Sequence, residues 1–135
     1  MSSSRILVIE DNPANLELVT DLLELAGHTV HSAAAAEPGL EIARREQPTL
    51  ILMDVSLPGM DGLAATRALK ADPKTQAIPV VALTAHAMRG DEELAREAGC
   101  LAYLTKPIET RTFPSRIAAL LVASRAVLDP NHQPA

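Results

Sequence analysis

Aromatic residues are almost absent from the 135-residue chain, which has one tyrosine, one phenylalanine and no tryptophan. Because 47% of the residues are hydrophobic, the core must be packed from leucine, isoleucine, valine and alanine, which suits helices layered on a parallel sheet. A chain of this length is expected to form one domain and needs no disulfide or structural metal. The single Cys100 cannot form an internal disulfide, and we expect it to be a small buried hydrophobic residue.

Long apolar runs and an excess of positive charge are also missing. No stretch reaches the roughly 18 apolar residues of a membrane span, and the N-terminal MSSSR lacks the apolar core of a signal peptide. The net charge of −5 argues against binding to nucleic acid or an anionic membrane, since both need concentrated lysine and arginine. We therefore expect a cytoplasmic protein without a nucleic-acid or membrane partner.

Short apolar runs alternate with helical patterns along the chain. The runs predict strands buried on both faces of a parallel sheet, at 5–9, 28–33, 50–55, 80–83 and 102–105. The helical patterns lie at 13–27, 37–47, 63–72, 90–99 and 109–126. In the first of them, Asn12 is the expected N-cap, Pro13 the first helical residue and Gly27 the stop.

Five strand–helix repeats with right-handed crossovers predict an α/β fold with a doubly wound, five-stranded parallel sheet of the flavodoxin-like kind. Residues 1–128 would form the domain. Residues 129–135, with two prolines and no apolar periodicity, would form a short flexible tail.

Polar residues collect where these predicted strands end, namely Glu10, Asp11, Asp54, Thr84 and Lys106. In open α/β sheets, ligands bind outside the carboxyl ends of the strands. Each residue taken singly could merely cap a helix or satisfy a loop. Three acids, a hydroxyl and an amine at neighbouring strand ends instead favour a common site.

Three crowded carboxylates repel one another by roughly 3 kcal/mol per pair at about 5 Å and an effective dielectric near 20. Lys106 offsets part of this repulsion, and a divalent cation would offset the rest. Mg²⁺ suits a site of carboxylates, water and phosphate oxygens, and Mn²⁺ could substitute. Asp54 is then the natural nucleophile of a phosphoryl-transfer site, with Lys106 and Thr84 contacting the phosphoryl oxygens.

The segments VIEDN, LILMDVSLPGMDG, VVALTAHA and YLTKP resemble, in order and spacing, the receiver domain of two-component response regulators, over residues 4–125. The resemblance implies that Asp54 is the phosphoacceptor. It implies that Asp11, Asp54 and the backbone carbonyl of Ser56 hold Mg²⁺, and that Glu10 acts through a metal-bound water. Lys106 would pair with the acceptor or its phosphate.

The same resemblance implies a conformational switch. Thr84 would be the switch hydroxyl and Tyr103 the switch aromatic residue, while the peptide bond before Pro107 would be cis. Ser56 and His86 occupy positions whose side chains tune the phosphoryl lifetime in this family. For His86, a merely exposed histidine is the equal alternative.

The implied function is that of a single-domain response regulator. A histidine kinase or a histidine phosphotransfer domain would donate the phosphoryl group, and a target protein would bind the fourth helix, fifth strand and fifth helix. The protein would catalyse only its own phosphorylation and dephosphorylation and would not otherwise be an enzyme. It would be a monomer or a weak phosphorylation-dependent dimer. Because the chain opens with Met1 and closes with a short tail, we expect a stand-alone regulator; the alternative is a receiver from a hybrid histidine kinase.

Three rival functions remain open. A nucleotide or flavin binder needs a glycine-rich turn after the first strand, whereas this chain has the acidic EDNPAN. Phosphohydrolases with an aspartyl nucleophile have an Asp-x-Asp pattern after the first strand, whereas Asp54 follows the third strand. A degenerate receiver that only binds partners is disfavoured by the intact set of polar residues.

Overall fold

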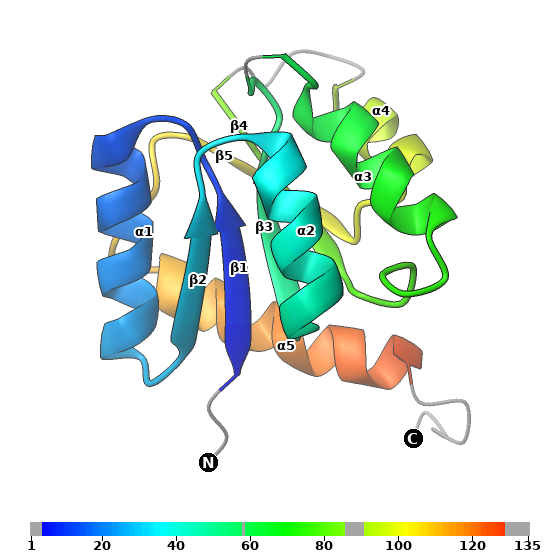
Figure 1. The fold of residues 1–135 in the computed structure, drawn as a ribbon. Coiled ribbons are helices and arrows are strands. Elements are labelled where there is room, and N and C mark those ends of the chain that lie inside the picture. The colour runs from blue at the N-terminus through cyan, green and yellow to red at the C-terminus, as the bar shows by residue number, and fades with distance from the viewer. Residues whose placement is uncertain (1–3, 58, 86–90, 129–135) are drawn as a thin grey trace.

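The computed structural model describes residues 4–57, 59–85 and 91–128 as alternating strands and helices (Figure 1). The elements are β1 (Arg5–Ile9), α1 (Pro13–Leu25), β2 (Thr29–Ala33), α2 (Ala36–Glu46), β3 (Leu50–Asp54), α3 (Gly62–Ala71), β4 (Val80–Thr84), α4 (Asp91–Ala98), β5 (Ala102–Thr105) and α5 (Phe113–Leu128). Within those residues, no helix combines the length and apolarity required to cross a bilayer.

The five strands form one parallel sheet in the order β2-β1-β3-β4-β5. This order confirms the predicted doubly wound α/β fold. The winding direction reverses between β1 and β3, because β2 lies on one side of β1 and all later strands lie on the other. A reversal of this kind opens a crevice at the carboxyl ends of the two strands.

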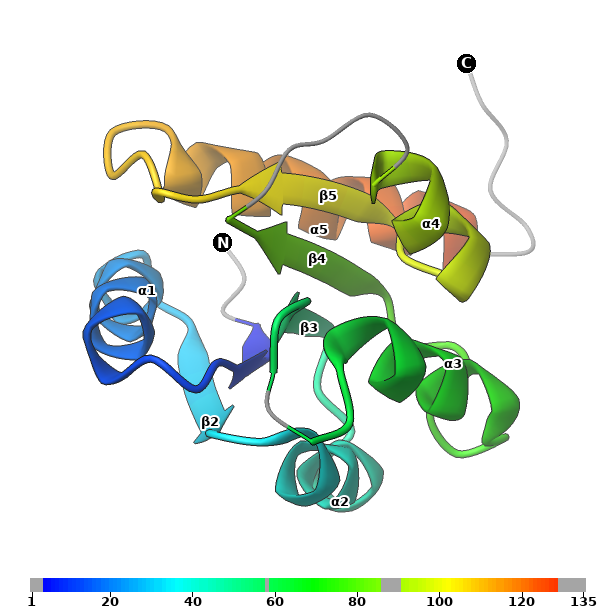
Figure 2. The same ribbon diagram turned by 90° about the horizontal axis from the view of Figure 1, so that it is seen from above.

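Helices cover both faces of the sheet (Figure 2). On one face, α1 and α5 pack against the strands through a cluster that includes Val19, Leu23, Phe113, Ile117 and Leu121. On the other face, α2, α3 and α4 contribute Leu40, Ala43, Ala65, Leu69 and Ala95. Every residue of β3 and β4 is buried, as their unbroken apolar runs predict.

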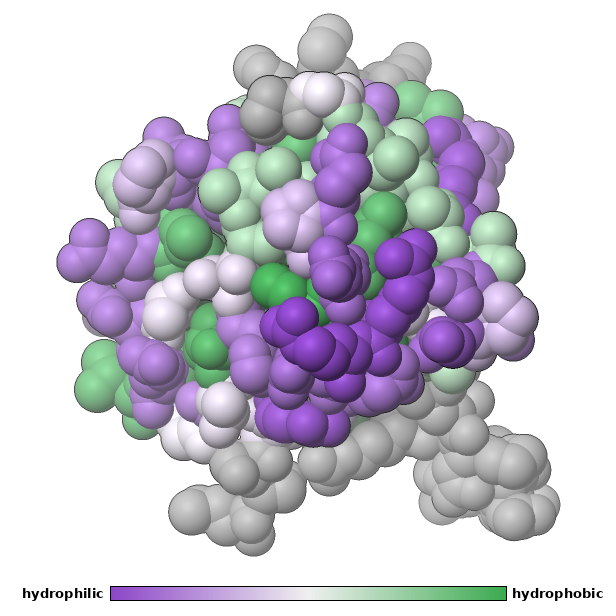
Figure 3. Space-filling view, in the orientation of Figure 1, coloured by the Kyte–Doolittle hydropathy of each residue, from purple (hydrophilic) through white to green (hydrophobic). Residues whose placement is uncertain are grey.

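The outer side of α2 is charged, with Glu37, Glu41, Arg44 and Arg45 exposed. The face of the molecule that has α2 at its front is correspondingly hydrophilic in the space-filling view (Figure 3). Polar residues outside and alanine or leucine inside give this helix its single packing face.

The boundaries of α1 follow from the residues predicted to set them. The side chain of Asn12 accepts a hydrogen bond from the Asn15 N–H at 3.0 Å, and Pro13 is the first helical residue. Gly27, with φ of +97°, lies just beyond the end of the helix in the left-handed region. The helix itself stops at Leu25, slightly before the predicted end.

Candidate functional site

The strand register brings the predicted polar residues to one edge of the sheet. Ile9 pairs with Met53, so that Glu10 and Asp54 lie side by side where β1 and β3 end. Thr84 pairs with Thr105 at the ends of β4 and β5. The backbone N–H of Lys106 donates to the Thr84 carbonyl at 2.7 Å, which holds the lysine at the same edge.

Three carboxylates meet at this edge. Glu10, Asp11 and Asp54 each offer an oxygen within 4.8 Å of the others. Glu10 and Asp54 are only 1% and 3% exposed, whereas Asp11 is exposed at the rim. The cluster therefore has a buried floor and one solvent-facing side, which the sequence alone did not distinguish.

Lys106 is the cation of the cluster. Its Nζ lies 2.6 Å from Glu10 Oε1 and 3.4 Å from Asp54 Oδ2, and its side chain is 13% exposed. The pairing with Asp54 was expected, but the closer pairing with Glu10 was not. The pairing of Ile9 with Met53 places Glu10 beside the end of β3, a detail of register that a linear sequence does not contain.

The two buried carboxyl groups differ in acidity. Burial and a hydrogen bond with Asp54 raise the pKa of Glu10 above its ordinary value. Burial also acts to raise the pKa of Asp54, but hydrogen bonds from Glu10 and from the Ser56 N–H, together with the charge of Lys106, outweigh it and lower that pKa. The Ser56 N–H donates to Asp54 Oδ1 at 3.0 Å. Asp54 is therefore the more acidic carboxyl group of the pair, as a nucleophile requires.

Gly62 lies close to the backbone of Asp54. A Cβ atom at Gly62, the first residue of α3, would collide with the backbone carbonyl of Asp54. The Gly62 N–H also donates to the Val55 carbonyl at 3.1 Å. Only glycine allows the start of α3 to approach this closely, so the second glycine of LPGMDG is explained by packing. The sequence analysis missed this role, although a glycine at a helix start was a signal for it.

Thr84 and Tyr103 line the same small cavity of about 120 Å³, together with Ser56 from the turn after β3. Tyr103 pairs with Ala82, two residues before Thr84, so both side chains lie on the same face of the sheet. Thr84 is buried, whereas the ring of Tyr103 is half-buried against α4. Burial and the negative charges of Asp91 and Glu92 raise the pKa of the Tyr103 phenol, so it remains neutral.

Several smaller expectations can be compared directly with the structure. The Lys106–Pro107 peptide bond is cis, as predicted. Cys100 is 7% exposed and packs near Thr66, which confirms it as a small buried residue. Ser56 lies in the turn after β3, beside the carboxylate of Asp54. His86 lies outside the described residues.

The family model for the response regulator receiver domain matches residues 6–118 of this chain. The chain belongs to the response regulator receiver domain family. The receiver is 42% identical over 116 residues to the polar-differentiation response regulator DivK of Brucella ovis. The aligned residues cover 86% of this chain and 94% of that protein.

Solved receiver structures have the same fold. A putative response regulator from Chloroflexus aurantiacus superposes with a TM-score of 0.84 at 29% identity, covering 90% of this receiver and 99% of that chain. The receiver domain of a sensor histidine kinase from Pseudomonas aeruginosa has a magnesium ion coordinated in its active-site cleft. It superposes with a TM-score of 0.78 at 34% identity, covering 90% of this receiver and 97% of that chain.

This receiver is therefore a two-component signalling domain of the type to which DivK belongs, and its family consists of signalling domains rather than conventional enzymes. Receivers bind Mg²⁺ at an acidic pocket, and the oxygen donors here fit that ion. Three carboxylates within reach of one another, one of them open to solvent, form the hard, anionic donor set that Mg²⁺ prefers.

Proposed function

We propose that this receiver is a single-domain response regulator that accepts a phosphoryl group from a phosphohistidine onto Asp54 in a Mg²⁺-dependent reaction. The observation that carries the proposal is the arrangement around Asp54, a buried carboxylate flanked by Glu10, Asp11 and Lys106 at the open end of the sheet. Transfer would form a bond between an Asp54 oxygen and phosphorus and break the phosphorus–nitrogen bond. The imidazole nitrogen keeps the electron pair of that bond.

The surroundings of Asp54 support its role as the nucleophile. The Ser56 N–H holds Oδ1, and Lys106 lies on the side of Oδ2, so the carboxylate has a defined orientation. Its lowered pKa keeps it ionised at neutral pH. After transfer, the Lys106 ammonium and the Thr84 hydroxyl would contact the phosphoryl oxygens, since both lie at neighbouring strand ends.

The metal would be held by Asp11, Asp54 and the backbone carbonyl of Ser56, with Glu10 acting through a water molecule. Bound Mg²⁺ would neutralise negative charge on the phosphoryl oxygens, and Mn²⁺ would serve with the same oxygen donors. The exposed Asp11 leaves the metal side of the cluster open to solvent and to a donor protein.

The cavity between Thr84 and Tyr103 supports a switch mechanism. A phosphorylated Asp54 would attract the Thr84 hydroxyl, and the space vacated would admit the Tyr103 ring, which now lies half-buried at the same cavity. The change would alter the face of α4, β5 and α5, where a target protein or a second subunit would bind. Ser56 and His86 would set the lifetime of the phosphoryl group.

The donor would be a histidine kinase or a histidine phosphotransfer domain in the cytoplasm. We propose residues 1–128 as the domain, in a monomer or a weak phosphorylation-dependent dimer. Residues 129–135, predicted as the tail, lie outside the described residues. Its likeness to DivK over nearly the whole length of that protein favours a stand-alone regulator. Its likeness to the receiver of a sensor histidine kinase keeps the hybrid-kinase alternative.

The acceptor is tested by incubating the protein with acetyl phosphate and Mg²⁺ and measuring its mass. Wild type should gain about 80 Da in a base-labile form, and Asp54→Asn should not. Asp61→Asn is the matched control, because Asp61 only caps α3 and asparagine caps equally well. A label that persists in Asp54→Asn would place the nucleophile elsewhere.

The hydrolase alternative is tested with an aryl phosphate. A receiver should complete at most a slow cycle through its own aspartyl phosphate, whereas a phosphohydrolase should release many equivalents of product. Sustained multiple turnover that depends on Asp54 would replace the proposed function with hydrolysis.

A further inference from the structure

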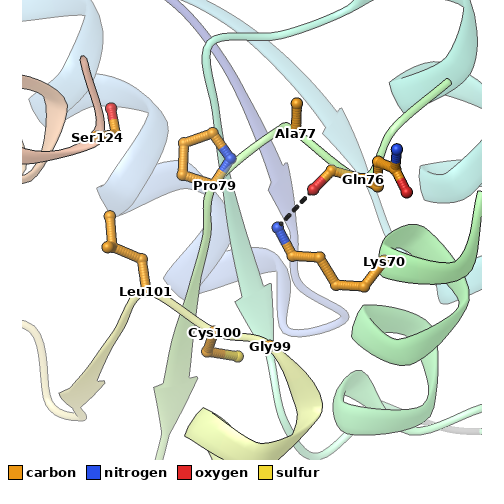
Figure 4. Close-up of a pocket in the computed structure, with 8 residues that line it drawn as sticks. All are labelled: Lys70, Gln76, Ala77, Pro79, Gly99, Cys100, Leu101 and Ser124. Atoms are coloured by element: carbon orange, nitrogen blue, oxygen red, sulfur yellow. Dashed lines mark hydrogen bonds between the residues drawn. The ribbon is translucent and has the colours of Figure 1, made fainter. Parts of the chain in front are cut away.

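A second hollow lies at the opposite edge of the sheet, where β4 and β5 begin (Figure 4). Its volume is about 310 Å³, at the lower end of the range of small-molecule sites. Four segments of the chain between residues 70 and 124 line it: Lys70 of α3, Gln76, Ala77 and Pro79 before β4, Gly99, Cys100 and Leu101 before β5, and Ser124 of α5.

Lys70 supplies the charge of this hollow. Its Nζ donates to the backbone carbonyls of Ile78 at 2.7 Å and Gln76 at 3.2 Å. Its stem is packed so tightly that a Cβ atom at Gly99 would lie 2.7 Å from Lys70 Cγ. The ammonium group is thus held in place at the hollow, as Figure 4 shows, rather than free in solvent.

In the part of the chain that the structure describes, the charge of Lys70 is not balanced by an acid. Among the described residues, no carboxylate pairs with Lys70, and its two acceptors are neutral carbonyls. An ammonium group has three donors, so one remains available. Burial lowers the pKa of Lys70, and the nearby Cys100 thiol offsets only part of this effect.

The remaining walls are largely apolar. Ala77, Pro79 and Leu101 present carbon atoms to the hollow. Burial raises the pKa of the Cys100 thiol, so it stays neutral and offers no anion to Lys70. The Ser124 hydroxyl is buried and donates to the Leu121 carbonyl at 2.9 Å. The hollow therefore combines a single fixed cation with apolar surroundings.

We propose that this hollow binds a small organic acid, with its carboxylate accepting a hydrogen bond from Lys70 Nζ and its apolar part against Pro79 and Leu101. A single ammonium group matches a single carboxylate. A phosphate or nucleotide would need more donors than Lys70 supplies, because each carries more charge and more acceptor oxygens. The site uses none of the residues around Asp54, so it is independent of phosphoryl transfer.

Benzoate is the first probe, followed through the backbone amide signals of the wild-type protein by NMR. Saturable shifts should appear below about 10 mM and centre on residues 76–78 and 99–101. Benzamide, which has the same shape but no charge, should bind at least about tenfold more weakly. Inorganic phosphate, which has charge but no apolar part, should leave these signals unchanged.

The matched variants are Lys70→Met and Lys74→Met. Methionine keeps much of the apolar stem and removes the charge, and Lys74 is an exposed lysine of the same region that does not line the hollow. Lys70→Met should weaken benzoate binding at least about tenfold, and Lys74→Met should leave it unchanged.

Equal affinity for benzoate and benzamide in wild type would overturn the proposal without requiring any variant to fold. Shifts centred away from the hollow, or an absence of saturable shifts, would also overturn it. Retained benzoate affinity in Lys70→Met, with the amide spectrum of a folded protein, would do the same.

Discussion

The two edges of the sheet carry opposite excesses of charge. At the carboxyl edge, three carboxylates meet, and Lys106 pairs with the two of them that are buried. At the amino edge, Lys70 is held by two neutral carbonyls without any acid among the described residues. In both places the charge of the described residues is unbalanced, which leaves room for an ion from outside: a cation at one edge and an organic anion at the other.

The difference lies in what each lysine compensates. Lys106 is the ion-pair partner of two buried acids, so its removal would leave them without a counter-ion. Lys70 compensates no charge, so its removal would leave only neutral carbonyls with one donor fewer. Charge imbalance therefore affects stability strongly at the first edge and weakly at the second.

The largest expected effect is the difference in stability between variants that lack Lys106 and variants that lack Lys70. Without Mg²⁺, Lys106→Met should lower the free energy of unfolding by about 3 kcal/mol, because it leaves buried carboxylates uncompensated. Lys70→Met should lower it by only about 1 kcal/mol, the usual worth of neutral hydrogen bonds. Urea denaturation of both variants at neutral pH provides the measurement. Equal losses would show that Lys106 does not neutralise the carboxylates.

The next effect is the response to metal. Millimolar Mg²⁺ should raise the free energy of unfolding of wild type by about 1 to 3 kcal/mol, since it binds only the folded cluster. Thermal or urea unfolding should show most of this gain lost in Asp54→Asn and retained in Asp61→Asn. An unchanged gain in Asp54→Asn would separate the metal from the acceptor.

A smaller effect is the pH dependence of the metal-free protein. The raised pKa of Glu10 means that the folded state holds this proton more tightly than the unfolded state, whose ordinary value is 4.5. The Glu10 contribution to stability should therefore decline as the pH rises from 4.5 through the raised pKa. Asp54, with its lowered pKa, acts in a separate window and loses its contribution only as the pH falls below 3.8.

Urea denaturation from pH 4.5 to neutrality should show this decline in wild type and a flatter profile in Glu10→Gln, which cannot titrate. At the other edge, the lowered pKa of Lys70 gives the opposite slope: stability should rise with pH on the alkaline side, up to the ordinary value of 10.5. Identical profiles for wild type and Glu10→Gln would contradict the raised pKa of Glu10.

The smallest expected effect is a loss of conformational response without a loss of stability. Beryllofluoride, a phosphoryl mimic, should shift the NMR signals of Tyr103 and of α4 and β5 in wild type. Thr84→Ala should still accept a phosphoryl group but show weaker shifts. It lacks the hydroxyl that would move toward the phosphoryl group and make room for the Tyr103 ring. Equal shifts in both proteins would remove Thr84 from the mechanism and leave Asp54 as acceptor.

Much of the site could be predicted from residue type and position. Apolar runs of strand length located all five strands, and acids or a hydroxyl at their ends located Glu10, Asp11, Asp54 and Thr84. The closer contact of Lys106 with Glu10 could not be predicted, since it depends on register and side-chain direction across the four strands from β1 to β5. The packing of Gly62 behind Asp54 was missed for a similar reason.

The sequence by itself determined the fold class, the order of the elements and the types of group at the carboxyl edge, because periodicity, caps and strand ends are local properties of the chain. Tertiary structure alone decided which carboxyl group is the more acidic, since burial and hydrogen bonds shift the pKa values of Glu10 and Asp54 in opposite directions. It also decided the hollow at Lys70, which exists only because α3, α5 and the segments before β4 and β5 meet there.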